Sequence, residues 1–139
     1  MYVVIMGCGR VGARLANLLV HAGHEVMVID VSESALGRLG SEFGGQTMVG
    51  DGIDMDDLQK AGLDRADAFA AVTQGDNRNI MASQIAKHIF NVPRVVTRIY
   101  DPIRTDTYRT LGLDAISPTV IGANVFYTTL TGEESQENV

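Results

Sequence analysis

The sequence predicts an α/β fold in which six parallel strands form one doubly wound sheet with helices on both faces. Two observations carry this prediction. Short β-branched runs alternate with helical patterns along the chain, and a glycine-rich turn joins the first strand to the first helix. The 139 residues, 45% of them hydrophobic, are enough for one domain with a sizeable core. We expect the strand order 3-2-1-4-5-6.

Six short runs are predicted strands because they are apolar, rich in β-branched residues and bounded by turn residues. They are residues 2–6, 25–30, 46–50, 67–73, 94–100 and 114–118. Continuous apolar runs of this kind are typical of parallel strands that are covered on both faces.

Helix signals fill the first segments between these strands. In the first helix Val11, Leu15 and Leu18 share one stripe, which we expect to face the core. Ser32 is the predicted N-cap of the second helix, and Asp54 is the predicted N-cap of a short third one.

The second half of the chain repeats this alternation. A helix over about 77–90 is expected to bury Met81, Ile85 and Ile89, and a short helix follows Pro102.

The segment after the last strand is an apolar helix with an unusual composition. No charged residue occurs from 115 to 132. On a helical wheel Val120 and Tyr127 share one stripe, Ile121 occupies a second side, and Phe126 flanks the first. We expect the sheet domain to cover one side and a twofold-related copy to cover the other. A membrane span is the competing interpretation, which a glycine, an asparagine and four threonines in this short run disfavour.

These elements divide the chain into three parts. Residues 1–118 form the predicted nucleotide-binding domain, 119–132 a C-terminal dimerisation or crossover helix, and 133–139 an acidic, disordered tail.

Composition narrows the classes of partner. The net charge of −6 leaves no basic surface for nucleic acid or for an anionic membrane. The single cysteine, Cys8, excludes an internal disulfide. We see no signal peptide and no apolar run of membrane-spanning length, so we expect a cytoplasmic protein without direct membrane insertion.

The sequence GCGRVG matches the pattern G-x-G-x-x-G at Gly7, Gly9 and Gly12, between the first strand and the first helix. Gly7 permits the tight turn, Gly9 lets a phosphate approach the backbone, and Gly12 lets the helix pack close to the strand. Phosphates would then lie at the helix N-terminus, where free N–H groups attract anions.

Asp30 ends the second strand, where it can accept hydrogen bonds from both ribose hydroxyls of a nucleotide. A glycine turn that served packing alone would not explain this acidic residue. Together the two features indicate a Rossmann-type dinucleotide-binding domain. Because Val31 and Ser32 follow Asp30 in place of an arginine, we expect NADP to be disfavoured.

Two arginines are candidate phosphate ligands. Arg10 lies inside the phosphate loop and can reach a phosphate oxygen, and a solvated surface arginine is the alternative. Arg98 ends the fifth strand, where it contacts a phosphate or forms a structural bridge to Asp76 or Asp101.

Polar residues also follow the third and fourth strands, at the same predicted edge of the sheet. Thr73 closes the fourth strand. Asp76 has the position of an N-cap with Asn79 at N3, so it serves as a ligand or only as a cap. Asp51 approaches the adenine edge or simply makes a turn.

The residues that a reaction would require are not evident. His21, His24 and His88 are best explained as surface residues near helix C-termini, and no cluster has metal-ligand spacing. Cys8 is a small turn residue with no base beside it. We therefore expect a non-catalytic binding domain. An NAD-dependent oxidoreductase fragment and an NADH/NAD redox sensor for another partner are the alternatives.

The combination of the glycine loop with GDGID (50–54), ADAFAAVTQGDNRN (66–79) and GLDAISP (112–118) resembles the KTN domain, also called the RCK N-lobe or TrkA-N domain. The resemblance covers residues 1 to about 130. Longer members carry a C-terminal lobe that binds a second effector, and this chain has no room for it.

The resemblance implies a cytosolic regulatory subunit that gates a potassium channel or transporter at the inner face of the membrane. It implies homodimers, which can assemble further into rings, and NAD(H) or ADP/ATP as an effector rather than a reactant. The implied nucleotide-binding residues are Gly7, Cys8, Gly9, Arg10, Val11, Gly12, Asp30, Asp51, Thr73, Asp76 and Arg98.

Overall fold

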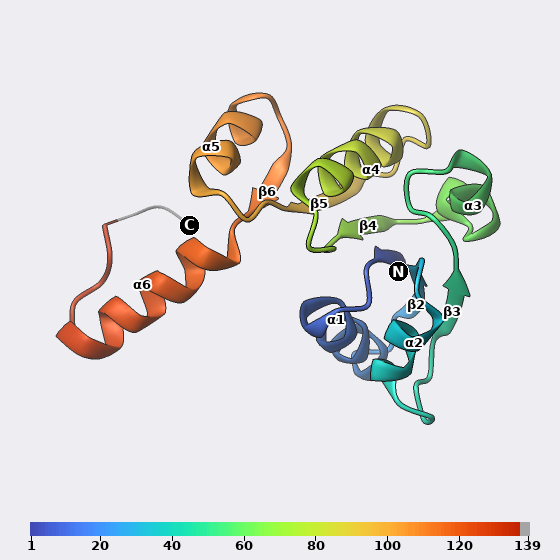
Figure 1. Ribbon diagram of the computed structural model, residues 1–139, viewed down its shortest axis with the longest axis horizontal. Helices are drawn as coiled ribbons and strands as arrows, with labels where there is room; N and C mark the ends of the chain where they lie inside the picture. The colour runs from blue at the N-terminus through green and yellow to red at the C-terminus, as the bar shows by residue number, and fades with distance from the viewer. Residues whose placement is uncertain (137–139) are drawn as a thin grey trace.

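A computed structural model describes residues 1–136, in which six strands form one parallel sheet of order β3-β2-β1-β4-β5-β6, as predicted (Figure 1). The strands are β1 (Tyr2–Met6), β2 (Glu25–Asp30), β3 (Gln46–Val49), β4 (Ala68–Ala71), β5 (Arg94–Arg98) and β6 (Asp114–Ile116). The helices are α1 (Arg10–His21), α2 (Glu33–Leu36), α3 (Met55–Lys60), α4 (Asp76–His88), α5 (Pro102–Thr110) and α6 (Pro118–Thr131), with the short 3-10 helices η1 (Gly37–Leu39) and η2 (Leu63–Arg65).

The direction in which successive strands are added to the sheet reverses at β1. From β1 the order runs to β2 and β3 on one side and to β4, β5 and β6 on the other. All five residues of β1 are buried. In a sheet of this type ligands bind outside the carboxyl ends of the strands, at the point where the order reverses. Here that point is the turn after Met6.

Helices cover both faces of the sheet (Figure 1), and one apolar cluster lies on each face. Ile5 and Val28 pack with Ala13 and Ala16 of α1 on one face. The opposite cluster lies beneath α3 and α4 and includes Phe69. Helices α1, α3 and α4 are therefore held by burial of the side that faces the sheet, which is the main source of stability for helices of 6 to 13 residues.

The two long sheet-covering helices bury their small residues, which corrects the predicted stripes. On α1 the buried residues include Ala13 and Ala16, whereas Leu18 is 58% exposed and Val11 is 41% exposed. On α4 a run of small side chains faces the sheet, and Met81 is 53% exposed. Small side chains let the helix axis approach the strands closely, so Val11, Leu18 and Met81 turn outward. Leu15 packs partly buried against the core, as expected.

Ile85 of α4 is partly buried against the core, while Ile89 is 51% exposed at the end of the helix. The predicted N-caps of the short helices are confirmed. The Ser32 hydroxyl accepts a hydrogen bond from the backbone N–H of Ala35, and the Asp54 carboxylate accepts from the N–H groups of Asp56 and Asp57.

Strands β5 and β6 are shorter than predicted because side chains form hydrogen bonds with the backbone N–H groups that follow each strand. β5 ends at Arg98, and the next free N–H groups, of Tyr100 and Asp101, donate to the carboxylate of Asp76. β6 ends at Ile116, because Ser117 is the N-cap of α6.

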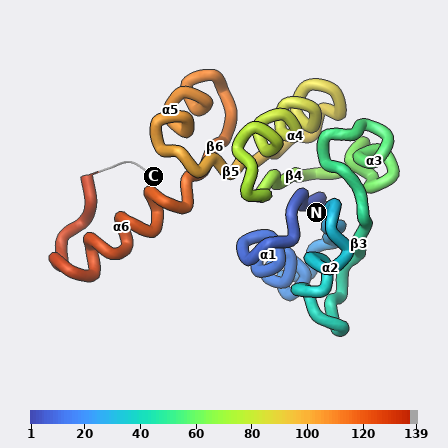
Figure 2. The backbone as a smooth tube through the Cα atoms, in the orientation of Figure 1, coloured from blue at the N-terminus to red at the C-terminus, as the bar shows by residue number. Residues whose placement is uncertain are grey.

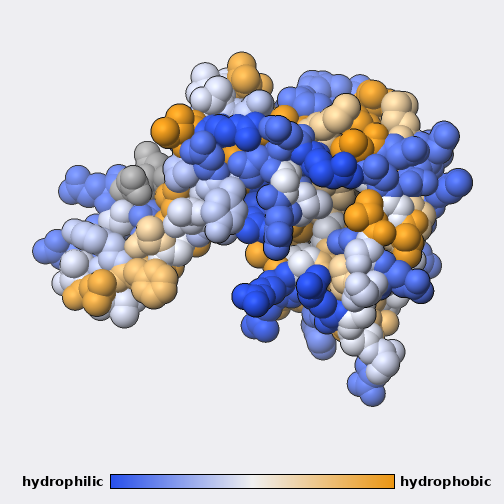
Figure 3. Space-filling model, viewed as in Figure 1, coloured by the Kyte–Doolittle hydropathy of each residue, from blue (hydrophilic) through white to orange (hydrophobic). Residues whose placement is uncertain are grey.

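Helix α6 extends away from the sheet (Figure 2). None of its residues is buried, so the expected cover of one side by the domain is wrong. Phe126 is 73% exposed and Leu130 is 84% exposed. Ser117 caps α6 at the edge of the sheet, and residues 1–136 leave the apolar surface of this helix exposed (Figure 3).

The expected tail begins at residue 133. In its described part, 133–136, the Ser135 hydroxyl lies 2.9 Å from the side-chain oxygen of Asn124 on α6. The remaining tail residues, 137–139, lie outside the described residues, and disorder there stays a prediction.

We expect Gly12→Ala to lower the free energy of unfolding by about 3 kcal/mol or more, because an added Cβ would lie 1.9 Å from the carbonyl oxygen of Gly7. Urea denaturation followed by circular dichroism measures this loss. Gly37→Ala is the matched control, since its added Cβ would meet no heavy atom within 4 Å, and it should stay within about 1 kcal/mol. Equal unfolding midpoints for the two variants would contradict the close approach of α1 to β1.

Candidate functional site

A cleft of about 860 Å³ opens at the carboxyl edge of the sheet, above the start of α1. It is lined by Gly7, Gly9, Arg10, Val11, Asp30, Ser32, Ser34, Ala35, Arg38, Val72, Thr73, Gln74 and Arg98. The turn after β1 thus forms its floor, with residues from β2–α2 on one side and from the ends of β4 and β5 on the other.

The glycine turn has the geometry that its sequence predicts. Gly7 has a φ of +109°, and a Cβ there would lie 2.9 Å from the backbone nitrogen of Thr73. Gly12 lets α1 approach the carbonyl of Gly7 and does not line the cleft. At Gly9 a Cβ would meet nothing within 4 Å, so that backbone is open to a ligand from the cleft.

Asp30 stands at the side of this turn and is tied to it. One carboxylate oxygen accepts a hydrogen bond from the Cys8 N–H at 2.8 Å, and the other accepts from the Ser32 N–H at 2.8 Å. The side chain is only partly buried and lines the cleft. Each carboxylate oxygen has a second lone pair, so acceptance from ribose hydroxyls is compatible with both bonds.

Three guanidinium groups face the cleft, against the single carboxylate of Asp30. Arg10 is exposed, and within residues 1–136 no hydrogen bond or ion pair occupies it. Arg38, from η1, donates to the carbonyl of Cys8 at 3.0 Å. This local excess of positive charge favours a ligand with several negative charges.

Arg38 was missed by the sequence analysis, which found no arginine directly after Asp30. Arg38 lies in η1, after α2, and the fold places it in the cleft lining together with Asp30 and Ser32. The expectation that a 2′-phosphate would meet Asp30 without a compensating cation is therefore not supported by the arrangement.

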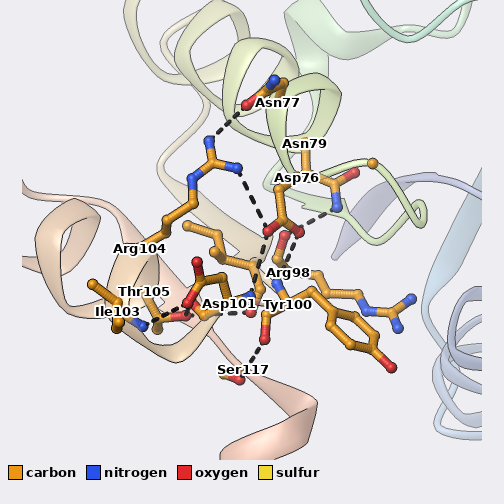
Figure 4. Close-up of polar contacts among 12 residues, drawn as sticks. Asp76, Asn77, Asn79, Arg98, Tyr100, Asp101, Ile103, Arg104, Thr105 and Ser117 are labelled. Atoms are coloured by element: carbon orange, nitrogen blue, oxygen red, sulfur yellow. Dashed lines mark hydrogen bonds and ion pairs between the residues drawn. The ribbon is translucent and has the colours of Figure 1, made fainter.

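Arg98 is the third cation, and it forms neither of the structural bridges considered from the sequence. Among residues 1–136, Asp76 pairs with Arg104 at 3.7 Å, and Asp101 caps α5 by accepting from the N–H of Ile103. The Arg98 guanidinium points away from both carboxylates (Figure 4). Its Nε atom is buried without a hydrogen-bond partner, which is the condition of a donor that lacks its acceptor.

Asp76 is placed differently from both predictions. The N-cap of α4 is Gly75, so Asp76 does not cap the helix. Its carboxylate accepts hydrogen bonds from the N–H groups of Tyr100, at 2.8 Å, and Asp101, at 3.4 Å (Figure 4). Asp76 lines neither the cleft nor a smaller hollow that adjoins the cleft on the side of β2 and β3. It holds the turn that follows Arg98.

A smaller hollow of about 200 Å³ adjoins the cleft on the side of β2 and β3. It shares Gly7, Asp30 and Thr73 with the cleft, and its other residues are Met6, Ile29, Val31, Gly50, Gly52, Gly75 and Arg78. This mostly apolar lining suits a flat ring. A Cβ on Gly52 would lie 1.9 Å from the sulfur of Met6, so the glycine keeps this wall compact.

Asp51 makes the turn that was one of its two predicted roles. Its side-chain oxygen accepts from the Ile53 N–H at 3.1 Å, and the same oxygen forms an ion pair with Arg78. Arg78 was not among the predicted site residues, because its helical position alone gives no sign of the hollow. Asp51 thus orients the guanidinium that lines the hollow.

Cys8 lies within the turn but does not line the cleft, and its side chain is fully buried. Burial raises the pKa of the Cys8 thiol. The Asp30 carboxylate adds to that rise in pKa, and Arg38 opposes it. A protonated, buried thiol is a poor nucleophile, which agrees with its prediction as a turn residue.

Over the described range, 1–136, no group of three or more histidine, cysteine and acidic residues could hold a metal ion. In the same range, every helix is too short or too polar to cross a membrane.

Comparison with known proteins identifies the family. Residues 3–118 match the TrkA-N domain. The chain belongs to the TrkA-N family. This TrkA-N domain is 50% identical over 117 residues to the Trk system potassium uptake protein TrkA of Streptomyces coelicolor, an alignment that covers 84% of this chain and 52% of that protein. The chain spans about half the length of the curated relatives it matches.

Two solved structures of GsuK are similar in fold and sequence to the TrkA-N domain. The structure of GsuK bound to ADP is 27% identical with a TM-score of 0.79, covering 96% of this chain and 34% of that one. The GsuK channel bound to NAD is also 27% identical with a TM-score of 0.79, covering 93% of this chain and 23% of that one.

We expect the native TrkA-N domain to resist alkylation of Cys8 by iodoacetamide at neutral pH, and the urea-unfolded chain to react fully. The reason is that the thiol is fully buried and its pKa is raised. Intact mass spectrometry measures the modification without ambiguity, because Cys8 is the one cysteine of the sequence.

The raised pKa also gives a pH dependence with a definite sign. The fold favours the neutral thiol, so this contribution to stability is complete below the pKa of the unfolded thiol, about 8.5, and is lost as the pH rises above it. Rapid stoichiometric labelling of the native protein at neutral pH would contradict both statements.

Proposed function

We propose that this TrkA-N domain binds an adenine nucleotide in its cleft and reports the bound state to a potassium uptake system as a non-catalytic regulatory part. The observation that carries the proposal is the cleft itself, where an open glycine turn, Asp30 and three arginines converge on one edge of the sheet. The TrkA relatives and the nucleotide-bound GsuK structures support it.

The smaller hollow suits the adenine of such a ligand, and the cleft suits its phosphates. The adenine would occupy the smaller hollow between Met6, Val31 and Arg78, with its ribose at Asp30. The phosphates would lie on the N–H groups of the glycine turn at the start of α1. Arg10 and Arg98 would then meet the phosphates from opposite sides of the cleft.

Both NAD(H) and ADP/ATP fit this scheme, because each carries at least two phosphates next to an adenosine. The ends of β4 and β5, with Thr73 and Arg98, provide room for the second half of a dinucleotide, which favours NAD(H) slightly. ADP or ATP would use the same arginines for its terminal phosphates.

The lining of the cleft supports an effector rather than a reactant. Asp30 is its one carboxylate among residues 1–136, both of whose oxygens accept backbone N–H groups, and neither histidine nor lysine lines it. Hydride transfer to a substrate needs a positioned acid or base. We therefore propose that bound nucleotide is not turned over.

The partner we propose is a potassium-transporting membrane protein, with the domain at the cytoplasmic face of the membrane. The relatives named as Trk system potassium uptake proteins and the similarity to the GsuK channel support this partner. The exposed apolar surface of α6 supports assembly of the chain into a homodimer, which can extend to a ring.

Calorimetric titration of the purified chain with NAD, NADH, NADPH, ADP and ATP tests nucleotide binding. We expect dissociation constants below the millimolar range for at least one of them. Arg10→Ala should weaken binding about tenfold or more, because it removes a charged hydrogen-bond donor from the phosphates. Arg14→Ala is the matched control, since Arg14 is an exposed arginine of α1 that does not line the cleft, and it should change affinity less than about twofold.

Absence of binding for all five nucleotides would overturn the proposed function. Equal losses for the Arg10 and Arg14 variants would show that only the overall charge matters, and the phosphates would then lie elsewhere. Consumption of bound NADH in the presence of small carbonyl compounds would instead favour an oxidoreductase.

We expect the chain to be a dimer at micromolar concentration and Phe126→Asp to make it a monomer that still binds nucleotide. Phe126 is 73% exposed on α6, and burying it against a second copy would contribute about 2–3 kcal/mol. Leu18→Asp is the matched control, because Leu18 is an apolar residue of α1 that is 58% exposed, and this variant should leave the dimer intact. Multi-angle light scattering measures the mass, and a monomeric unsubstituted chain would contradict the interface.

A further inference from the structure

Asn79 is a fully buried polar residue in the first turns of α4, and its side chain uses all of its hydrogen-bonding groups. Its oxygen accepts from the backbone N–H of Thr73 at 3.0 Å and from the Thr73 hydroxyl at 2.6 Å. Its amide group donates to the carbonyl of Thr73 at 2.9 Å and to the carbonyl of Arg98 at 3.0 Å. Two acceptor and two donor positions are the full capacity of an asparagine side chain.

The two residues that Asn79 joins line the same side of the cleft, at the ends of two neighbouring strands. Thr73 follows β4 and Arg98 ends β5. The pairing of these strands ends at Ala71 and Thr97, so no strand hydrogen bond links their backbones at the cleft. Asn79 supplies the missing link (Figure 4).

We infer that Asn79 is a positioning residue of the nucleotide cleft, which sets where the Arg98 guanidinium meets the phosphate chain. The inference rests on the proposed nucleotide binding. Asp76 assists from the same helical turn by holding the N–H groups of Tyr100 and Asp101, just after Arg98. The backbone is thereby held at the carbonyl of Arg98 and at the N–H groups of Tyr100 and Asp101.

The position of β5 in the sheet determines which part of the ligand depends on the hydrogen bond between Asn79 and the Arg98 carbonyl. β5 lies two strands from β1, which is about 10 Å at the usual spacing between strands. A first phosphate on the glycine turn after β1 is close to Arg10. A second phosphate extends toward β4 and β5, where the buried, unpartnered Nε of Arg98 lacks an acceptor. Asn79 should thus matter for diphosphates more than for AMP.

The same helix provides a matched control. Ser83 lies one turn after Asn79, is also fully buried, and accepts a hydrogen bond from the Thr97 hydroxyl at 2.6 Å. This pair likewise joins α4 to β5, but neither residue lines the cleft. A substitution at Ser83 removes a buried link between the same two elements without touching the proposed ligand.

The test compares affinities for ADP and AMP, measured by calorimetry, in Asn79→Asp, Asn79→Ala and Ser83→Ala. The aspartate variant keeps the shape but replaces both donors by oxygen, which repels the carbonyls of Thr73 and Arg98. The alanine variant serves if that carboxylate prevents folding. For Asn79 variants we expect ADP to bind about tenfold more weakly and AMP to change less than about threefold. For Ser83→Ala we expect both affinities to stay within about twofold.

Equal losses for ADP and AMP in the Asn79 variants, or no loss for either, would overturn the positioning role. A selective loss of ADP in Ser83→Ala as well would show that any loosening of α4 against β5 has this effect, and would also overturn it. If the unsubstituted chain binds NAD but not ADP, NAD takes the place of ADP as the diphosphate in this comparison. Failure of the unsubstituted chain to bind any of NAD, NADH, NADPH, ADP and ATP would overturn the proposed function itself, which makes the two failures distinguishable.

Discussion

The contact on which the site depends is the close approach of α1 to the end of β1. With an added Cβ at Gly12 only 1.9 Å from the Gly7 carbonyl, no other residue type fits without moving the helix. Gly7 turns the chain with a φ of +109° directly beside the backbone of Thr73. The free N–H groups at the start of α1 therefore lie over the central strand of the sheet, where the strand order reverses.

From this contact the electrostatics of the cleft follow. The chain has a net charge of −6, yet three arginines and one carboxylate line the cleft. The two oxygens of the Asp30 carboxylate each accept a hydrogen bond from a backbone N–H group. An acidic protein thus presents a local positive surface beside the free backbone donors at the start of α1, and this combination suits the phosphates of the proposed nucleotide.

The turn after β5 connects this cleft with α6. Asp76 holds the backbone of Tyr100 and Asp101, and the Ser117 hydroxyl donates to the Tyr100 carbonyl at 3.3 Å (Figure 4). Ser117 is also the N-cap of α6. The helix with the largest exposed apolar surface is therefore anchored on the same turn that follows Arg98. In the proposed regulatory role, the hydrogen bond between Ser117 and Tyr100 links the sensing end of the domain to its assembling end.

Local patterns in the sequence were sufficient for the order of the strands, the glycine turn and the acidic residue that follows the second strand. Apolar periodicity, glycine spacing and caps such as Ser32 and Asp54 act within a few residues, so they can be recognised without knowing the fold. The match to the TrkA-N family over 3–118 confirms the resemblance that these patterns suggested.

Only the tertiary structure decided which long side chains meet in the cleft. Arg38 and Arg78 reach the site from segments whose local sequence carries no ligand signal. The sequence indicates a helix cap at Asp76 and Asn79, yet both also bind backbone groups 19 to 25 residues away, on β5 and the turn after it. The helix faces were likewise set by how closely each axis approaches the sheet. The physical reason is common to all of these: the partner of a polar group is chosen by distances between segments remote in sequence, which no local pattern encodes.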